Sequence, residues 1–257
     1  MARVIAIANQ KGGVGKTTTS QALAASLKRR GHKVLAVDMD PQGNLSESVG
    51  ADIKNLMSIY EVFKGESTAL DAVQSLEAFD IICSDSVLAS AEQTLTQLGR
   101  EYLLKEALEP LKGIYEYIVV DTPPSLNMLT INALVAANEA IIPTNAGYFS
   151  ARGIHELAGS IESVRKFYNS DLYVSGVLLT RYNPRLINSR DMKELTEMIA
   201  EHIGSKLFKT YIRVNVAVEE SQVVHKDLYS FAPDSAAACD YEDFVSEWLA
   251  IKEGTNG

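Results

Sequence analysis

Cysteine, tryptophan and long apolar stretches are all scarce in this chain of 257 residues. The two cysteines, Cys83 and Cys239, are too few for a disulfide scaffold, and their isolation argues against a cysteine-based metal site, so we expect two buried thiols. No apolar run approaches the roughly 20 residues that span a bilayer. The amino terminus MARVIAIANQ enters an apolar strand without the layout of a signal peptide. These absences together predict a cytoplasmic protein.

Basic charge is also in short supply. The net charge of -9 disfavours indiscriminate attraction to nucleic acid or to anionic lipid, so either kind of binding would require a local basic patch. The hydrophobic content of 46% is enough to fill one large core, and the chain shows neither an internal repeat nor a low-complexity linker. We therefore expect a single domain over residues 1–252, followed by a disordered tail at 253–257.

Short apolar runs recur along the chain and alternate with segments of helical length. Near-continuous apolar strands of this kind are typical of a parallel sheet that helices cover on both faces. The segment TTTSQALAASLKRRG has helical spacing, a basic last turn and a terminating glycine. The predicted fold is a doubly wound α/β domain with a mostly parallel sheet. The expected strands are Arg3–Ala8, Lys33–Asp38, Phe79–Ser84, Tyr115–Asp121, Glu139–Thr144 and Tyr173–Thr180.

The stretch NQKGGVGKTTT follows the first expected strand and nearly matches the phosphate-binding pattern G-x-x-x-x-G-K-[ST]. Its glycines let backbone N–H groups approach phosphate oxygens at the amino end of a helix, where the helix dipole favours anions. Lys16 would neutralise β- and γ-phosphate oxygens, and the Thr17 hydroxyl would bind Mg²⁺. The stretch departs from the pattern in having Gln10 in place of the first glycine and a second lysine, Lys11, directly after it.

Three carboxylates follow expected strands. Asp38 and Asp40 lie in VDMDPQGN, and Asp121 lies in VVDTPPS. Ligands of open parallel sheets bind beyond the carboxyl ends of the strands, where the glycine-rich loop is also expected. Asp121 has the position of the acidic residue that supports magnesium, with an ordinary helix cap as the alternative role. The sequence therefore predicts a magnesium-dependent nucleotide site at this end of the sheet.

The segments KGGVGKTTT, VDMDPQGN and VVDTPPS, in this order and at these separations, resemble the ParA/Soj family of deviant phosphate-loop ATPases, relatives of MinD and of the nitrogenase iron protein. The likeness covers residues 3–180 and extends more loosely to Trp248. It implies an ATP hydrolase with ATP and Mg²⁺ as cofactors. It also implies a homodimer that forms on ATP binding, holds duplex DNA without sequence preference, works with a ParB-like centromere-binding protein and is associated with the nucleoid.

The resemblance assigns a role to the additional lysine. Lys11 would reach across the dimer to the phosphates that the other subunit holds, and a positive charge delivered in this way acts as an arginine finger does. Asp40 would position the attacking water. Lys11, Lys16 and Asp40 are therefore the expected catalytic residues.

The resemblance also completes the expected metal and nucleotide contacts. Thr17, Asp38 and Asp121 would support Mg²⁺, the two carboxylates through water. Beyond Thr180 the likeness weakens, and Asn215 in YIRVNVAVEESQ and Arg181 are the candidates for the base pocket. The expected nucleotide contacts are Lys11, Gly12, Gly13, Val14, Gly15, Lys16, Thr17, Thr18 and Asn215.

One segment inverts the overall charge of the chain. Between residues 181 and 213, seven basic residues stand against four acidic ones, a local excess of +3 in a chain of -9. The segment is a candidate for nonspecific DNA contact, with an ordinary mixed-charge helical face as the alternative. The expected DNA-binding residues are Arg185, Arg190, Lys206, Lys209 and Arg213.

Three other functions belong to similar proteins. A membrane-positioning ATPase such as MinD would need a basic amphipathic helix at the carboxyl terminus, whereas YEDFVSEWLAIKEGTNG carries four acids and one lysine, so we expect no membrane partner. An iron–sulfur ATPase would need a cysteine that DTPPS does not contain. A positioner of a protein cargo on the nucleoid stays open as an alternative to DNA partitioning.

Overall fold

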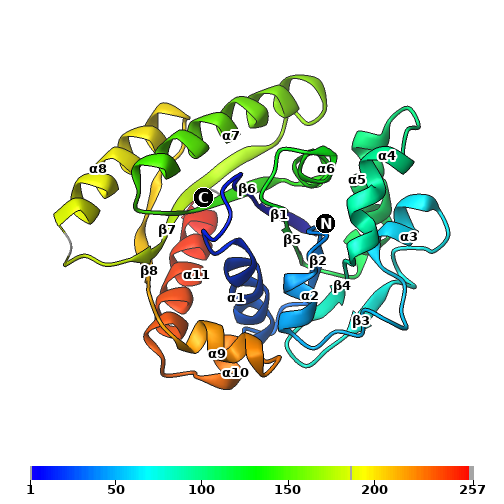
Figure 1. The fold of residues 1–257 in the computed structure, drawn as a ribbon, viewed down its shortest axis with the longest axis horizontal. Coiled ribbons are helices and arrows are strands. Elements are labelled where there is room, and N and C mark those ends of the chain that lie inside the picture. Colours follow the sequence, from blue (N-terminus) through cyan, green and yellow to red (C-terminus); the bar gives the residue numbers. More distant parts are fainter. Residues whose placement is uncertain (1, 186, 255–257) are drawn as a thin grey trace.

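The structure, a computed structural model, describes residues 2–185 and 187–254. Its strands form one sheet in the order β3-β4-β2-β5-β1-β6-β7-β8, and within the described residues the β3–β4 pair is the antiparallel one (Figure 1). This arrangement confirms the predicted α/β fold with its mostly parallel sheet. The strands are β1 (Arg3–Ile7), β2 (Val34–Asp38), β3 (Val73–Ser75), β4 (Asp80–Ile82), β5 (Tyr117–Asp121), β6 (Glu139–Asn145), β7 (Tyr173–Tyr182) and β8 (Leu207–Arg213).

Helices cover both faces of this sheet (Figure 1). The helices α1, α10 and α11 pack on one face, and α3, α5, α6 and α7 pack on the other. The α-helices are α1 (Lys16–Arg29), α2 (Asn44–Ser48), α3 (Ile59–Lys64), α4 (Ala91–Thr94), α5 (Leu103–Leu108), α6 (Met128–Ala136), α7 (Tyr148–Phe167), α8 (Ile187–His202), α9 (Ala217–Val223), α10 (Leu228–Phe231) and α11 (Ala236–Gly254). Short 3-10 helices lie at Ser86–Ser90, Arg100–Tyr102 and Glu109–Gly113.

The central strand β1 shows why the strands of this sheet have continuously apolar sequences. Successive side chains of a strand point to opposite faces. Val4 and Ala6 therefore enter the core beneath α5, α6 and α7, while Ile5 and Ile7 enter the core beneath α1 and α11. Because both faces are covered, no position of the strand favours a polar residue.

The sequence analysis does not predict strands β3 and β8, and its prediction that both cysteines are buried is wrong for one of them. The strands β3 and β8 lie at the two edges of the sheet and mix polar with apolar residues, so they lack the continuous apolar signal of the central strands. Cys83 is buried as predicted, but Cys239 is exposed, because it lies on the solvent side of α11. Helix α11 runs to Gly254 and so contains the first two residues of the expected tail, and residues 255–257 lie outside the described residues.

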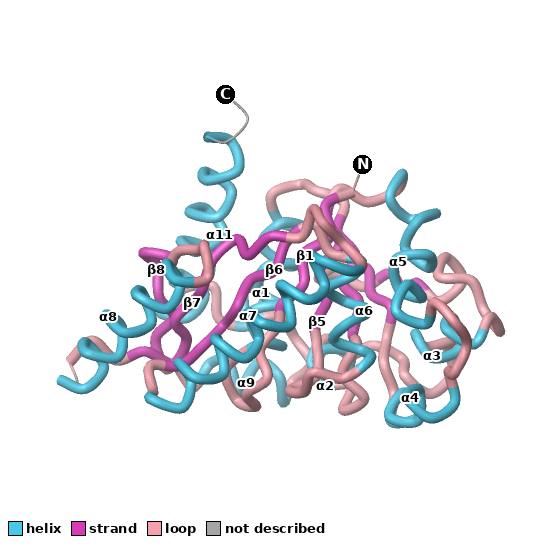
Figure 2. Tube along the Cα trace, turned by 90° about the horizontal axis from the view of Figure 1, so that it is seen from above, coloured by secondary structure: helices cyan, strands magenta, loops and turns pink. Residues whose placement is uncertain are grey.

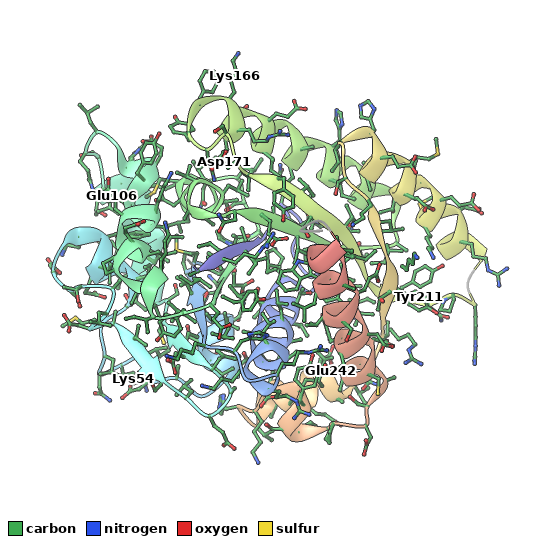
Figure 3. The ribbon with its side chains drawn as sticks, turned by 180° about the vertical axis from the view of Figure 1, so that it is seen from behind. Lys54, Glu106, Lys166, Asp171, Tyr211 and Glu242 are labelled. Carbon is green, nitrogen blue, oxygen red and sulfur yellow. The ribbon has the colours of Figure 1, made fainter. Side chains whose placement is uncertain are left out.

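The last helix is an integral part of the core. Trp248 of α11 is fully buried, and its Nε1 donates a hydrogen bond to Oε2 of the buried Glu139 at 3.1 Å. Glu139 in turn pairs with Arg3 at the start of β1. On the outer side of α11, Glu242 accepts from Arg30 at the end of α1 at 2.8 Å, and Figure 3 shows Glu242 on this helix. These contacts tie the carboxyl-terminal helix to β1, β6 and α1.

The apolar face of α11 is committed to this packing. Tyr241, Phe244 and Trp248 all belong to the core cluster on the α1 side of the sheet. In the part of the chain that the structure describes, no helix is long and apolar enough to cross a membrane.

Candidate nucleotide-binding site

A cleft of about 530 Å³ opens at the carboxyl ends of the parallel strands. The glycine-rich loop after β1, Asp40 after β2, Thr180 in β7 and residues of α9 line it. Figure 2 shows α2 and α9 at this end of the molecule, and both chain termini at the opposite end. The cleft therefore lies where a doubly wound sheet is expected to bind its ligand.

The loop between β1 and α1 depends on glycine at two positions. Gly13 and Gly15 have φ angles of 71° and 78°, in the left-handed region that side-chain-bearing residues rarely adopt. Thr180 fastens the loop from β7, because its Oγ1 donates to the carbonyl oxygen of Val14 at 2.8 Å. The loop ends at α1, whose first residues Lys16, Thr17 and Thr18 all line the cleft or its entrance. Backbone N–H groups at this helix terminus face any anion in the cleft.

Lys16 is largely buried at the base of the loop. Its Nζ donates to the carbonyl oxygen of Lys11 at 3.2 Å. Burial lowers the pKa of Lys16, and the nearby charges of Asp121 and Asp40 oppose this effect. An ammonium group in such a site gains by binding an anion, because phosphate oxygens would replace the hydration that burial removes.

Asp121 connects the end of β5 to the first turn of α1. Its Oδ2 accepts a hydrogen bond from the Thr17 hydroxyl, and its Oδ1 accepts one from the Ser20 hydroxyl, both at 2.8 Å. The carboxyl group is fully buried, and burial together with the charge of Asp38 raises its pKa to about 7. Such a group is costly to ionise without a nearby cation.

Asp38 occupies a similar environment at the end of β2. Its Oδ2 accepts from the backbone N–H and the hydroxyl of Ser46, at 2.9 and 2.8 Å, and its Oδ1 accepts from the N–H of Asp40. Burial raises the pKa of Asp38 to about 6 in spite of these hydrogen bonds. Asp40 is directed differently, because it lines the cleft itself.

This donor set fits magnesium. Mg²⁺ prefers hard oxygen ligands and keeps several of its waters. The Thr17 hydroxyl lies at the cleft, and the two buried carboxyl groups, paired as β2 and β5 neighbours at Asp38 and Asp121, stand directly behind it. A divalent cation beside Thr17 would favour the ionised form of both carboxyl groups.

Lys11 is directed away from Lys16. Its Nζ donates to Oδ1 of Asn145 at the end of β6, at 3.3 Å. Its backbone N–H donates to Oδ1 of Asn9, and the Asn9 side-chain amide donates to the carbonyl oxygen of Pro143. Among the described residues that line the cleft, Lys16 is present and Lys11 is not. The two lysines of the loop therefore occupy different environments.

The far side of the cleft is formed by the end of β8 and by α9. Ile212, Val214 and Val218 give this side an apolar character, as a nucleotide base requires. Asn215 also lines it, and its Oδ1 accepts from the N–H of Ala217 at 2.9 Å. Arg181 lines the same cleft from β7, with a φ angle of 50° that is rare for a residue with a side chain.

The structure does not gather the five expected DNA contacts into one cluster. Arg185, just before α8, and Arg190, in the first turn of α8, are both exposed, and Arg190 donates to the carbonyl oxygen of Pro184. Lys206 precedes β8 at its amino end, and Lys209 is exposed along that strand. Arg213, at the other end of β8, is bound by Asp240 at 2.7 Å and lines the nucleotide cleft.

Side chains from α8 and α11 contact the outer edge of the sheet at β8. Tyr211 lies on β8 at this edge in Figure 3, with the Tyr182 ring 4.8 Å from its own and the Lys193 ammonium 6.0 Å from it. Glu247 of α11 accepts from the N–H groups of Lys209 and Thr210, at 2.8 and 2.9 Å. The edge is thus partly covered by the carboxyl-terminal helix.

Four polar residues of the site were missed by the sequence analysis. Ser20 stands one helical turn after Thr17, so helical spacing alone could have placed it on the same face. Ser46, Asn145 and Thr180 come from segments distant in sequence, and each meets its partner only when the sheet is assembled.

Sequence comparisons show which known proteins this chain resembles. The sequence model of a family described as an AAA domain matches residues 2–174. The sporulation initiation inhibitor protein Soj of Bacillus subtilis is 38% identical over 256 residues, which cover 97% of this chain and 99% of Soj. The chromosome partitioning protein ParA of Caulobacter vibrioides is 40% identical over 254 residues, which cover 96% of this chain and 94% of ParA.

A solved structure of a similar protein has the same fold. The crystal structure of cobyrinic acid a,c-diamide synthase from Mycobacterium smegmatis with bound ADP and magnesium is 34% identical, with a TM-score of 0.85. The match covers 98% of this chain and 96% of that chain.

Proposed function

Because the chain belongs to the ParA/Soj family of phosphate-loop ATPases, we propose that it is a DNA-partitioning ATPase that works as an ATP-bound dimer. In this proposal the dimer holds duplex DNA without sequence preference, and a ParB-like centromere-binding protein stimulates hydrolysis and release. The cargo would be a plasmid or a chromosome in the cytoplasm, at the nucleoid.

ATP and Mg²⁺ are the cofactors, as in similar structures that hold ADP or an ATP analogue with magnesium. Lys16 and the N–H groups of Gly12, Gly13, Val14 and Gly15 would bind the phosphates, and Thr18 would bind the α-phosphate. Thr17 would hold Mg²⁺, with Asp38 and Asp121 acting through water. The bound cation would offset negative charge on the β- and γ-phosphates.

Hydrolysis requires a positioned water and a stabilised phosphoryl group. Asp40 lines the cleft and is only 7% exposed, and it would orient the water. Lys11 would act on the phosphates of the partner subunit. The observation that carries this assignment is the divergence of the two lysines, since Lys16 stands at the cleft and Lys11 is held at the end of β6.

DNA contact is assigned to the start of α8, with Arg185 just before the helix and Arg190 in its first turn. Arg185 and Arg190 are both exposed there, whereas the guanidinium of Arg213 is already paired with Asp240. One subunit offers few phosphate contacts, and each contributes about -0.9 to the slope of log affinity against log salt. Dimerisation doubles the number of contacts, so DNA binding should depend on ATP.

The test is a salt series of DNA-binding isotherms with unrelated duplexes. We expect binding to appear only with ATP and Mg²⁺, to weaken steeply with salt, and to fall in Arg190→Glu while sizing still shows the ATP-dependent dimer. Lys105→Glu, on α5, is the control for a change of charge alone. Failure of a demonstrably dimeric, ATP-bound wild type to bind DNA at low salt would refute the partitioning function. Unchanged binding in Arg190→Glu would move the DNA contact elsewhere.

A MinD-like membrane function has less support. Its membrane contact would need the apolar face of the carboxyl-terminal helix, and Phe244 and Trp248 bury that face in the core. A nucleoid positioner of protein cargo shares the ATP and DNA steps, so it differs in the partner alone. Copurification of a centromere-binding protein would separate the two.

A further inference from the structure

Three hydrogen bonds to other described residues hold Lys11 within its own chain. Asn9 accepts from its backbone N–H at 3.0 Å, Lys16 donates to its carbonyl oxygen at 3.2 Å, and Asn145 accepts from its ammonium group at 3.3 Å. Asn9 is itself 2% exposed and anchored to the carbonyl oxygen of Pro143. The lysine is therefore held at the carboxyl end of β6.

One of these three hydrogen bonds, from Lys16 to the Lys11 carbonyl oxygen, should respond to nucleotide. Lys16 Nζ is the group that would bind the β- and γ-phosphates, and an ammonium group that moves to phosphate gives up its bond to the Lys11 carbonyl oxygen. The acceptors of the other two hydrogen bonds, Asn9 and Asn145, lie outside the residues that line the cleft in the described chain. ATP would thus loosen the backbone of Lys11 and leave its side chain held by Asn145.

We propose that Asn145 is a positioning residue that holds the Lys11 ammonium group in its own subunit and so sets the threshold for ATP-dependent dimerisation. The proposal rests on the proposed function, in which Lys11 acts across the dimer. To do so, the ammonium group must leave Asn145, and the lost hydrogen bond opposes dimer formation. Each subunit contributes one such bond, so the opposing effect counts twice in the dimer.

Two substitutions of Asn145 should change the strength of its hydrogen bond to the Lys11 ammonium group in opposite directions. Asn145→Ala removes the acceptor, and Asn145→Asp replaces it with a carboxylate that binds an ammonium group more strongly. A partly exposed hydrogen bond to a charged group corresponds to about a fivefold change per lysine, or about 25-fold for a dimer. Asn145→Ala should lower the dimer dissociation constant by this factor, and Asn145→Asp should raise it.

The measurement is sedimentation equilibrium with Mg²⁺ and a nonhydrolysable ATP analogue. Asn138→Ala is the matched control, because Asn138 precedes β6 and also loses one side-chain acceptor bond, to the N–H of Val4, at the opposite end of the strand. Its dimer constant should equal that of the wild type. A general loss of stability would weaken dimerisation in both Asn145 variants. The proposed role of Asn145 instead predicts tighter dimerisation of Asn145→Ala and weaker dimerisation of Asn145→Asp.

A second measurement tests the hold in the monomer. An amine-reactive ester, read out by mass spectrometry, should label Lys11 faster in Asn145→Ala than in the wild type, while labelling of Lys105 stays the same. Equal Lys11 labelling would overturn the proposal whatever the dimer does. Faster labelling with unchanged or weaker dimerisation of Asn145→Ala would overturn the threshold role. A wild type that stays monomeric with the ATP analogue would instead refute the proposed dimer itself, and the threshold with it.

Discussion

Thr180 offers a direct test of how the sheet supports the phosphate loop. Its side chain is 2% exposed, and Oγ1 lies 2.8 Å from the carbonyl oxygen of Val14 and 3.1 Å from that of Thr144. The single hydroxyl proton is therefore within reach of two buried oxygens. Thr180→Val keeps the branched shape of the side chain and removes only this donor.

The expected cost follows from the burial of these groups. A buried polar group that loses its partner costs about 1–3 kcal/mol. Taking about 2 kcal/mol, the melting temperature of a protein of this size should fall by about 4–8 °C. The loop would also have to be ordered when ATP binds, so we expect ATP affinity to fall by about fivefold, equivalent to about 1 kcal/mol.

Thermal and urea unfolding measure the effect on stability, and an equilibrium titration with ATP and Mg²⁺ measures the effect on affinity. Thr180→Ser is the control, since it keeps the hydroxyl and loses a methyl group at a cost of about 1 kcal/mol, with ATP affinity as in the wild type. A valine variant within about 0.5 kcal/mol of the wild type would refute the anchoring role. Lower stability with unchanged ATP affinity would limit the hydrogen bond to folding.

Three further predictions concern other parts of the site and the core. Asp40→Ala should accumulate an ATP-bound dimer with little turnover, and wild-type turnover would place the water-positioning role elsewhere. Gly176→Ala should destabilise the protein by about 1–3 kcal/mol in urea, because the added Cβ would lie 2.4 Å from the buried ring of Phe208; an unchanged midpoint would mean that the ring moves without cost. Asp121 has a folded pKa raised by burial to about 7, so its protonated form stabilises the ligand-free protein at low pH and this contribution is lost as pH rises through about 7. Unfolding at about pH 5.5 and about pH 8 should therefore show a larger difference for the wild type than for Asp121→Asn, and equal differences would contradict the raised pKa.

The central strands and the phosphate loop could be predicted because each carries a local signal. The run VIAIA after Arg3 is apolar throughout since β1 is covered on both faces, and the glycines that follow mark the loop. The edge strand β8 has no such signal. Only Phe208 and Ile212 of its residues LFKTYIR are buried, with exposed or half-buried residues around them, and its edge is partly covered by Glu247, a residue of another element.

In the candidate site, too, only the residues that lie in a local sequence motif could be predicted. Lys16, Thr17 and Asp121 could be named from short motifs because a motif keeps its residues together. The partners that orient them come from distant segments, as Thr180 and Asn145 do, and only tertiary structure brings them to the loop. The expected DNA contacts stay a prediction. A count of charges along the sequence could not show that Lys206 precedes β8 whereas Arg213 ends it.

The position of the single tryptophan has a practical consequence for spectroscopy. Trp248 is fully buried against Glu139, at the start of β6, whereas the nucleotide cleft opens beyond the carboxyl ends of the strands. Its intrinsic fluorescence should thus change strongly when the core is exposed to solvent and change little when nucleotide enters the cleft. Trp248 should therefore serve as an intrinsic reporter of unfolding, and nucleotide titrations should use a fluorophore attached at the other end of the sheet.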